Sequence, residues 1–178
     1  MNQSLVDDMS PLIAISVTTG ILSGIWGWAA LSLGLLSWAG FLGCTSYFAS
    51  PKDGVTGLAQ SLLTNMSGVV WAMVIIHGSS LINMEIAGYV MTALVSFFMC
   101  IQAKRAWLQY IPGTFIGACA TFAADGAWQI VVPSLILGGL FGYTMKASGL
   151  WLHKQLSNSD LDNSNSEANN AKTALAND

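Results

Sequence analysis

The sequence predicts an all-α membrane protein with six transmembrane helices, built as two inverted three-helix repeats with both termini in the cytoplasm. Three observations lead to this prediction. The 178-residue chain is 53% hydrophobic and only 8% charged, whereas a soluble domain carries about 25% charged residues. Its basic residues fall in a few polar turns and near the C-terminus. A shift of 74 residues aligns part of the first half with the second.

Six apolar segments are expected to be helices, each bounded by polar or Pro/Gly-containing turns. They cover residues 11–32, 35–50, 55–81, 85–102, 108–124 and 128–152. The transmembrane domain therefore spans 10–155, with one repeat over 11–81 and the other over 85–152. Residues 1–9 are a cytoplasmic N-terminus, and 156–178 are expected to be a disordered cytoplasmic tail because they are polar and aperiodic.

The positions of the basic residues predict the topology. If all six segments cross the bilayer, one side holds the N-terminus, the Lys52 turn, the Lys104–Arg105 turn and the C-terminal end. That side then carries all six Lys and Arg residues. If the short segments 35–50 and 108–124 were re-entrant, the basic residues would be divided between the two sides. The positive-inside rule therefore favours six spans.

The internal match pairs the two short segments. It lays residues 41–49 over 115–123, with Phe, Gly, Phe and Ala in the same positions. Because each half contributes three spans, the second copy must cross the membrane in the opposite direction. Inverted repeats of this kind occur in many transporters.

A candidate solute path follows from the repeated positions. Two glycines lie mid-span in the short segments, where they allow either close helix packing or a narrow passage lined by backbone. An amide near the bilayer centre must bond to a neighbouring helix or to a crossing solute. The candidate residues are Gly43, Phe48, Asn65, Gly117 and Phe122.

The chemistry in the spans is neutral. No Asp, Glu, Lys or Arg is predicted at mid-membrane depth, which argues against proton-coupled transport. The polar groups within the spans are chiefly Gln60, Thr64, Asn65, Ser67, Thr45, Ser46 and Thr121. No catalytic constellation, metal site or cofactor motif is recognisable, and the chain has no basic patch for nucleic acid. Cys44, Cys100 and Cys119 have no CxxC spacing and are interpreted as packing residues.

Two functions are compatible with these features. The first is a passive channel or facilitator for a small neutral or weakly charged solute. The second is a structural or regulatory membrane protein that binds partners through helix–helix contacts. Beyond the lipid bilayer and a possible solute, the expected partner is a second copy of the chain. The GxxxG pairs Gly20–Gly24 and Gly138–Gly142 predict a homo-oligomer.

Several long stretches resemble the YcdZ family of bacterial inner-membrane proteins. They are residues 20–28, 35–44, 112–122 and 148–152, and the likeness extends over residues 10–155. The resemblance implies a bacterial inner-membrane location. Because the family is a domain of unknown function, it implies no catalytic or binding residue.

Overall fold

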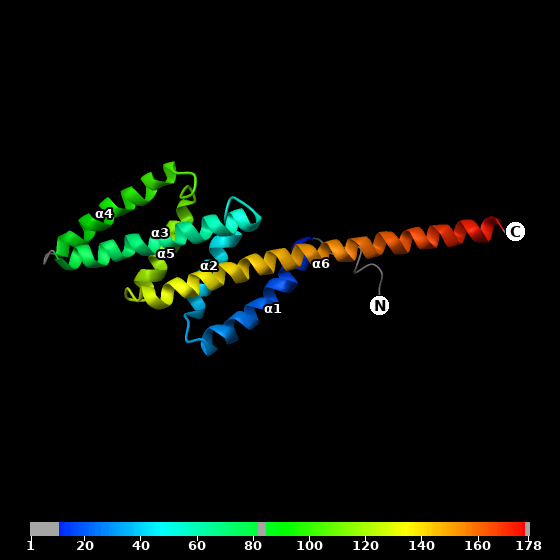
Figure 1. Ribbon diagram of the computed structural model, residues 1–178, viewed down its shortest axis with the longest axis horizontal. Helices are drawn as coiled ribbons and strands as arrows, with labels where there is room; N and C mark the ends of the chain where they lie inside the picture. The colour runs from blue at the N-terminus through cyan, green and yellow to red at the C-terminus, as the bar shows by residue number, and fades with distance from the viewer. Residues whose placement is uncertain (1–10, 82–84, 177–178) are drawn as a thin grey trace. The chain divides into compact units, whose positions relative to one another are not determined.

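The computed structural model describes residues 11–81 and 85–176, and within them the chain is helical (Figure 1). The helices in these ranges are α1 (Pro11–Ser32), α2 (Ser37–Phe48), α3 (Gly54–Leu81), α4 (Glu85–Ile101), the short 3-10 helix η2 (Gln102–Lys104), α5 (Ile111–Ala123) and α6 (Trp128–Ala176). The predicted apolar segments thus each contain one α-helix.

The turns form where the sequence supplies residues that tolerate a left-handed backbone. Gly34 and Gly54 have positive φ values of 66° and 63°, and they lie at the two ends of the α2 region. Asp125 and Gly126 do the same between α5 and α6, with φ values of 50° and 79°. Glycine adopts this conformation without steric cost, and Asp is among the few other residues that do so.

The six α-helices of the described chain differ in length, and α4, with 17 residues, lies between the long and the short ones. α1, α3 and α6 are long and apolar enough to cross a membrane. α2 and α5 have only 12 and 13 residues. At 1.5 Å per residue these two are about 18–20 Å long, shorter than the ~30 Å hydrocarbon core. The short pair therefore needs cover from neighbouring protein at membrane depth.

The C-terminal region differs from the sequence prediction. Residues 156–178 were expected to be disordered, but α6 continues without a break to Ala176. This stretch contains no Gly or Pro. Extending an existing helix fixes one residue for each hydrogen bond gained, so the long apolar span acts as a nucleus for the polar extension.

The chain divides into two compact units. Among the described residues, one unit combines residues 11–21 with residues 145–176, and the other lies between them in the sequence, within Leu22–Thr144. Within the first unit, Thr18 Oγ1 donates a hydrogen bond of 2.9 Å to the carbonyl oxygen of Met145. Gly149 lies against Ile15, so a Cβ atom at Gly149 would be 2.5 Å from the Ile15 Cα. A glycine thus allows α1 and α6 to approach closely here.

The second unit is centred on α3 and α5, and Figure 1 shows α5 crossing α3. Buried apolar side chains pack on both sides of this crossing. One cluster joins α3 and α5 to α4, and the other joins them to the first turns of α6. The members are Ala72, Ile75, Val95, Met99 and Ala118 in the first, and Val69, Ala120, Val131 and Leu135 in the second.

Much of the remaining apolar surface is exposed. α1 and α4 carry large exposed hydrophobic side chains along their length, including Leu12, Ile21, Trp28, Val90 and Phe97. Soluble monomers rarely expose continuous apolar surface of this kind, whereas lipid-facing helices do. The exposed pattern thus agrees with the apolar composition.

Candidate functional site

The two glycines of the predicted path lie at close helix contacts. A Cβ atom at Gly117 would overlap the carbonyl oxygen of Asn65 and lie 2.9 Å from its Cα. A Cβ atom at Gly43 would overlap the carbonyl oxygen of Leu135 and lie 3.1 Å from the amide nitrogen of Gly139. Gly117 thus packs α5 on α3, and Gly43 packs α2 on α6. These are the contacts that the packing interpretation expects.

The other three predicted residues differ in burial. Asn65 is fully buried and forms the α3 side of the Gly117 contact. Phe48 and Phe122 are 37% and 41% exposed and lie on the outer surface. The structure therefore brings Asn65 and Gly117 together, and the two phenylalanines do not join them around one constriction.

The Asn65 side chain bonds to neighbouring helices. The side chain is oriented with its amide nitrogen toward hydrogen-bond acceptors, because this orientation satisfies both the nitrogen and the oxygen of the amide. In this orientation the two N–H groups face three acceptors: the carbonyl oxygen of Gly113 at 2.9 Å, that of Ser61 at 3.2 Å, and Ser46 Oγ at 2.8 Å. One amide therefore links α3 to both short helices.

Gln102, the first residue of η2, is a second polar centre. Its Oε1 accepts hydrogen bonds from Ser67 Oγ at 2.8 Å and from Trp71 Nε1 at 3.0 Å. Its Nε2 donates to Thr114 Oγ1 at 3.2 Å. These bonds hold the turn after α4 against α3 and α5. The sequence prediction missed this residue, because an amide beside Lys104 and Arg105 resembles an ordinary membrane boundary.

Two buried polar atoms in the same region lack a protein partner among the described residues. Gln60 is 2% exposed and its Nε2 donates to the carbonyl oxygen of Ala106 at 3.3 Å, but its Oε1 has no partner. The Tyr110 hydroxyl has Ser46 as its polar neighbour, yet no atom of the described chain meets hydrogen-bond geometry toward it. Thr64 and Gly113 connect the two, since a Cβ at Gly113 would touch Thr64 Oγ1 and lie 2.7 Å from Tyr110 Cδ1.

We call the residues Ser46, Gln60, Thr64, Asn65 and Tyr110 the polar cluster. All are buried, and none carries a formal charge at neutral pH. Such a cluster can exchange hydrogen bonds with water or with an uncharged solute, but it offers no anionic or cationic ligand. In the described part of the chain, no three His, Cys, Asp or Glu side chains gather as a metal site would require.

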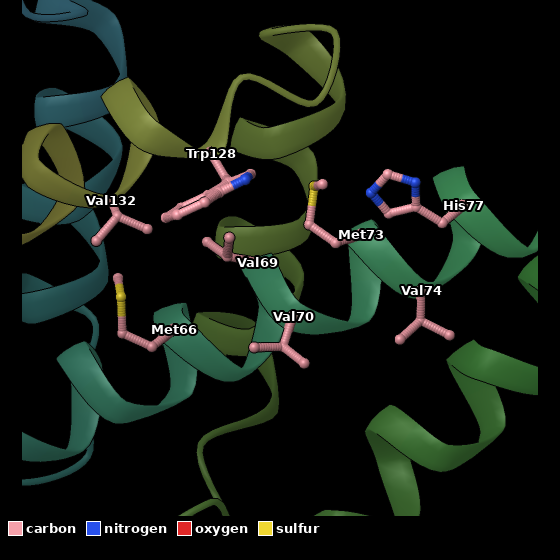
Figure 2. Close-up of a pocket in the computed structure, with 8 residues that line it drawn as sticks. All are labelled: Met66, Val69, Val70, Met73, Val74, His77, Trp128 and Val132. Carbon is pink, nitrogen blue, oxygen red and sulfur yellow. The ribbon is translucent and has the colours of Figure 1, made fainter.

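A groove lies outside the polar cluster, along the other side of α3 (Figure 2). It has a volume of about 490 Å³. The α3 residues on its wall are Met66, Val69, Val70, Met73, Val74 and His77. Trp128 and Val132 of α6 complete it. Figure 2 shows the indole of Trp128 lying between Val132 and Met73, with His77 at the far end.

Comparison with known proteins identifies the family. The family model described as "Protein of unknown function (DUF1097)" matches residues 16–150. "Inner membrane protein YcdZ" of Escherichia coli (strain K12) is 67% identical over 145 residues, which cover 81% of this chain and 89% of that protein. The protein of the same name from Salmonella typhimurium (strain LT2) is 65% identical over 145 residues, covering 81% of this chain and 91% of that protein.

A more distant relative has the same extent. "Uncharacterized protein YahC" of Escherichia coli (strain K12) is 28% identical over 153 residues, covering 79% of this chain and 92% of that protein. No solved structure matches the chain. The inner-membrane names of the two similar relatives agree with the long apolar helices of the structure. The chain is therefore a multi-pass inner-membrane protein, and it belongs to the YcdZ-like DUF1097 family, whose function is unknown.

Proposed function

We propose that the protein is a passive facilitator for a small neutral or weakly charged solute, with six spans arranged as two inverted three-helix repeats and both termini in the cytoplasm. In this arrangement α1–α3 form one repeat and α4–α6 the other. The proposed solute contact is the polar cluster. The sequence suggested a path that passes Gly43 and Gly117, and in this proposal the polar cluster takes their place at its centre.

Equivalent contacts in the two halves support the repeat. Gly117 of α5 packs on Asn65 of α3, and 74 residues away Gly43 of α2 packs on Gly139 of α6. The pairing is reciprocal, because the shift takes residue 43 to 117 and residue 65 to 139. An exchange of partners between halves is what a two-fold axis lying in the membrane plane would produce.

A second set of contacts follows the same rule. A Cβ atom at Gly68 would lie 2.7 Å from the amide nitrogen of Ala118, and one at Gly142 would lie 3.0 Å from the Cα of Cys44. The shift of 74 residues again takes Gly68 to Gly142 and Cys44 to Ala118. Both short helices are thus covered by the long helix of the opposite half. That cover explains how helices of 12 and 13 residues could lie at membrane depth.

Polarity breaks this symmetry. The residues at the positions equivalent to Ser46, Asn65 and Tyr110 are apolar or lack a side chain: Ala120, Gly139 and Leu36. On the proposed topology the polar cluster lies toward the cytoplasmic ends of α2, α3 and α5. In the outer half, Gly40 and Gly43 of α2 pack closely against Gly138 and Leu135 of α6. A solute would therefore meet the polar cluster from the cytoplasm first.

The observation that carries the proposal is the buried Gln60 Oε1, which has no hydrogen-bond partner among the described residues. Leaving such an atom without a hydrogen bond costs about 1–3 kcal/mol in a protein interior, and no lipid group can supply one. A permeating solute or water can. A passive mechanism also agrees with the neutrality of the cluster, because ion-coupled carriers use buried ionisable groups.

One observation favours the alternative, a structural or regulatory protein that acts through helix–helix contacts. The α1 glycines Gly20 and Gly24 have no heavy atom of another residue near their Cβ positions. The matching pair Gly138 and Gly142 of α6 is already covered by α2. A free GxxxG face on α1 is suited to a second membrane helix, including α1 of another copy.

Flux through proteoliposomes distinguishes these functions. Purified protein is reconstituted and the uptake of urea, glycerol, small amides and short-chain weak acids is compared with that of empty vesicles. The test variants are Gln60→Met and Tyr110→Phe. Their matched controls are Gln129→Met and Tyr89→Phe, which change the same side chains at exposed positions.

The two functions predict different pairs of results. Tyr110→Phe removes a buried hydroxyl whose polar neighbour is Ser46, so thermal stability is measured beside flux to show that each variant stays folded. If the cluster contacts a solute, flux of at least one compound falls in Tyr110→Phe and Gln60→Met while both controls retain it. Absence of flux above empty vesicles for every compound, with folded protein, would contradict the facilitator and leave the helix-contact function.

A further inference from the structure

The groove of Figure 2 is apolar along its length and polar at one end only. Met66 lies at one end and His77 at the other, with valine and methionine side chains between them. Trp128 covers part of the groove from α6. Its lining differs from that of the polar cluster, since no residue is common to both.

The length of the groove matches one leaflet of a bilayer. Met66 to His77 is eleven residues, or about 16 Å of helix at 1.5 Å per residue. Half of a ~30 Å hydrocarbon core is about 15 Å. On the proposed topology Met66, in the middle of α3 (Gly54–Leu81), lies near the midplane. The groove therefore extends from the bilayer centre to the outer interface.

The volume limits what can occupy the groove. A helix about 10 Å wide and 16 Å long fills more than twice the ~490 Å³ available. A single hydrocarbon chain is narrow enough to lie in it. Val70, Val74 and Trp128 are exposed, so the open side of the groove faces the surroundings, which are lipid at this depth.

The outer end carries groups that suit a zwitterionic headgroup. The imidazole of His77 and the indole of Trp128 can donate hydrogen bonds to a phosphate. The Asp125–Gly126 turn lies beside them, because a Cβ at Gly126 would be 3.2 Å from Ile76 Cδ1 and 4.0 Å from Met73 Sδ. Asp125 is exposed there and supplies a carboxylate for an ammonium group.

We infer that this groove is a binding site for one phospholipid of the outer leaflet, with an acyl chain along α3 and a phosphoethanolamine headgroup between His77 and Asp125. The choice of leaflet and the choice of headgroup both rest on the proposed topology. On that topology all six basic residues lie in the polar turns and the C-terminal region of the opposite side. An anionic headgroup would therefore meet a carboxylate without a compensating Lys or Arg.

Native mass spectrometry of the detergent-purified protein tests the inference. Delipidated protein is titrated with dioleoylphosphatidylethanolamine and, separately, with dioleoylphosphatidylglycerol. Val70→Trp fills the groove at a residue that is 61% exposed, and Val90→Trp makes the same change on α4 at a residue that is 52% exposed. Wild type and Val90→Trp should each bind one phosphatidylethanolamine per chain more tightly than phosphatidylglycerol, and Val70→Trp should not.

The headgroup contact is tested separately. His77→Ala is expected to weaken phosphatidylethanolamine binding about tenfold or more, as loss of a hydrogen bond to a charged group does. His77→Gln retains an N–H donor and should recover part of that loss. Equal lipid binding by Val70→Trp and Val90→Trp would overturn the inference. A Val70→Trp variant that changes only the oligomeric mass would also overturn the inference, because the groove would then bind a second copy of the chain.

Discussion

Replacing Gly117 by alanine gives the sharpest test of the helix packing. The added Cβ would overlap the Asn65 carbonyl oxygen and lie 2.7 Å from the carbonyl carbon. Both obstacles are backbone atoms, so no side-chain rotation can relieve the overlap and α5 must move away from α3. Overpacking of this kind costs about 1–3 kcal/mol. We expect the upper end of that range, because the same movement would disturb the Asn65 hydrogen bonds.

Gly88→Ala is the matched control. Gly88 lies in α4 with nothing within 4 Å of its Cβ position. Alanine is favoured over glycine in a helix by about 0.8–1 kcal/mol. The two variants should therefore shift the free energy of unfolding in opposite directions, separated by about 3–4 kcal/mol. Unfolding by sodium dodecyl sulfate, followed by tryptophan fluorescence, measures both. A Gly117→Ala protein as stable as Gly88→Ala would refute the packing of α5 on α3.

Three further predictions follow from the structure and the proposed topology. Gln102→Leu leaves Ser67, Trp71 and Thr114 without their shared partner. It should lower the unfolding free energy by about 1–3 kcal/mol for each of these groups that stays buried in the same detergent titration, and unchanged stability would contradict the Gln102 contacts. Ala127→Cys should react with an impermeant maleimide added to intact cells, whereas Lys52→Cys should react only after permeabilisation, and the reverse would remove the six-span topology. Gly24→Leu should reduce the oligomeric mass in native lipid without changing stability. A wild-type protein that is itself a monomer would exclude homo-oligomer formation through α1.

The sequence predicts the helices well where local chemistry decides them. The Ser-Pro-Lys-Asp-Gly turn before α3 separates it from α2 as expected. The C-terminal extension of α6 was missed, because polarity was read as disorder. In the absence of Gly and Pro, a helix can continue beyond a long apolar span even where the added residues form no apolar face.

The site could be predicted only in part. The repeat pointed to Gly43, Asn65 and Gly117, but the partner of each residue depends on how the halves pack. Nothing in the local sequence shows that Gly43 meets α6 while Gly117 meets α3. The sequence does not single out Tyr110, since a tyrosine between a basic turn and a helix is typical of membrane boundaries. Its burial results from the α5 crossing, a long-range contact.

Accessibility of the polar cluster is the most direct test of the central claim, that this cluster is a solute path rather than a sealed core. Ser46→Cys is introduced after Cys44, Cys100 and Cys119 are replaced by alanine, and inside-out vesicles are treated with a small methanethiosulfonate. Lys52→Cys, in the turn between α2 and α3, is the accessible control. The account predicts that Ser46→Cys reacts, that urea or glycerol slows the reaction, and that the modification reduces flux. A Ser46→Cys thiol that stays unmodified while Lys52→Cys reacts fully would contradict it.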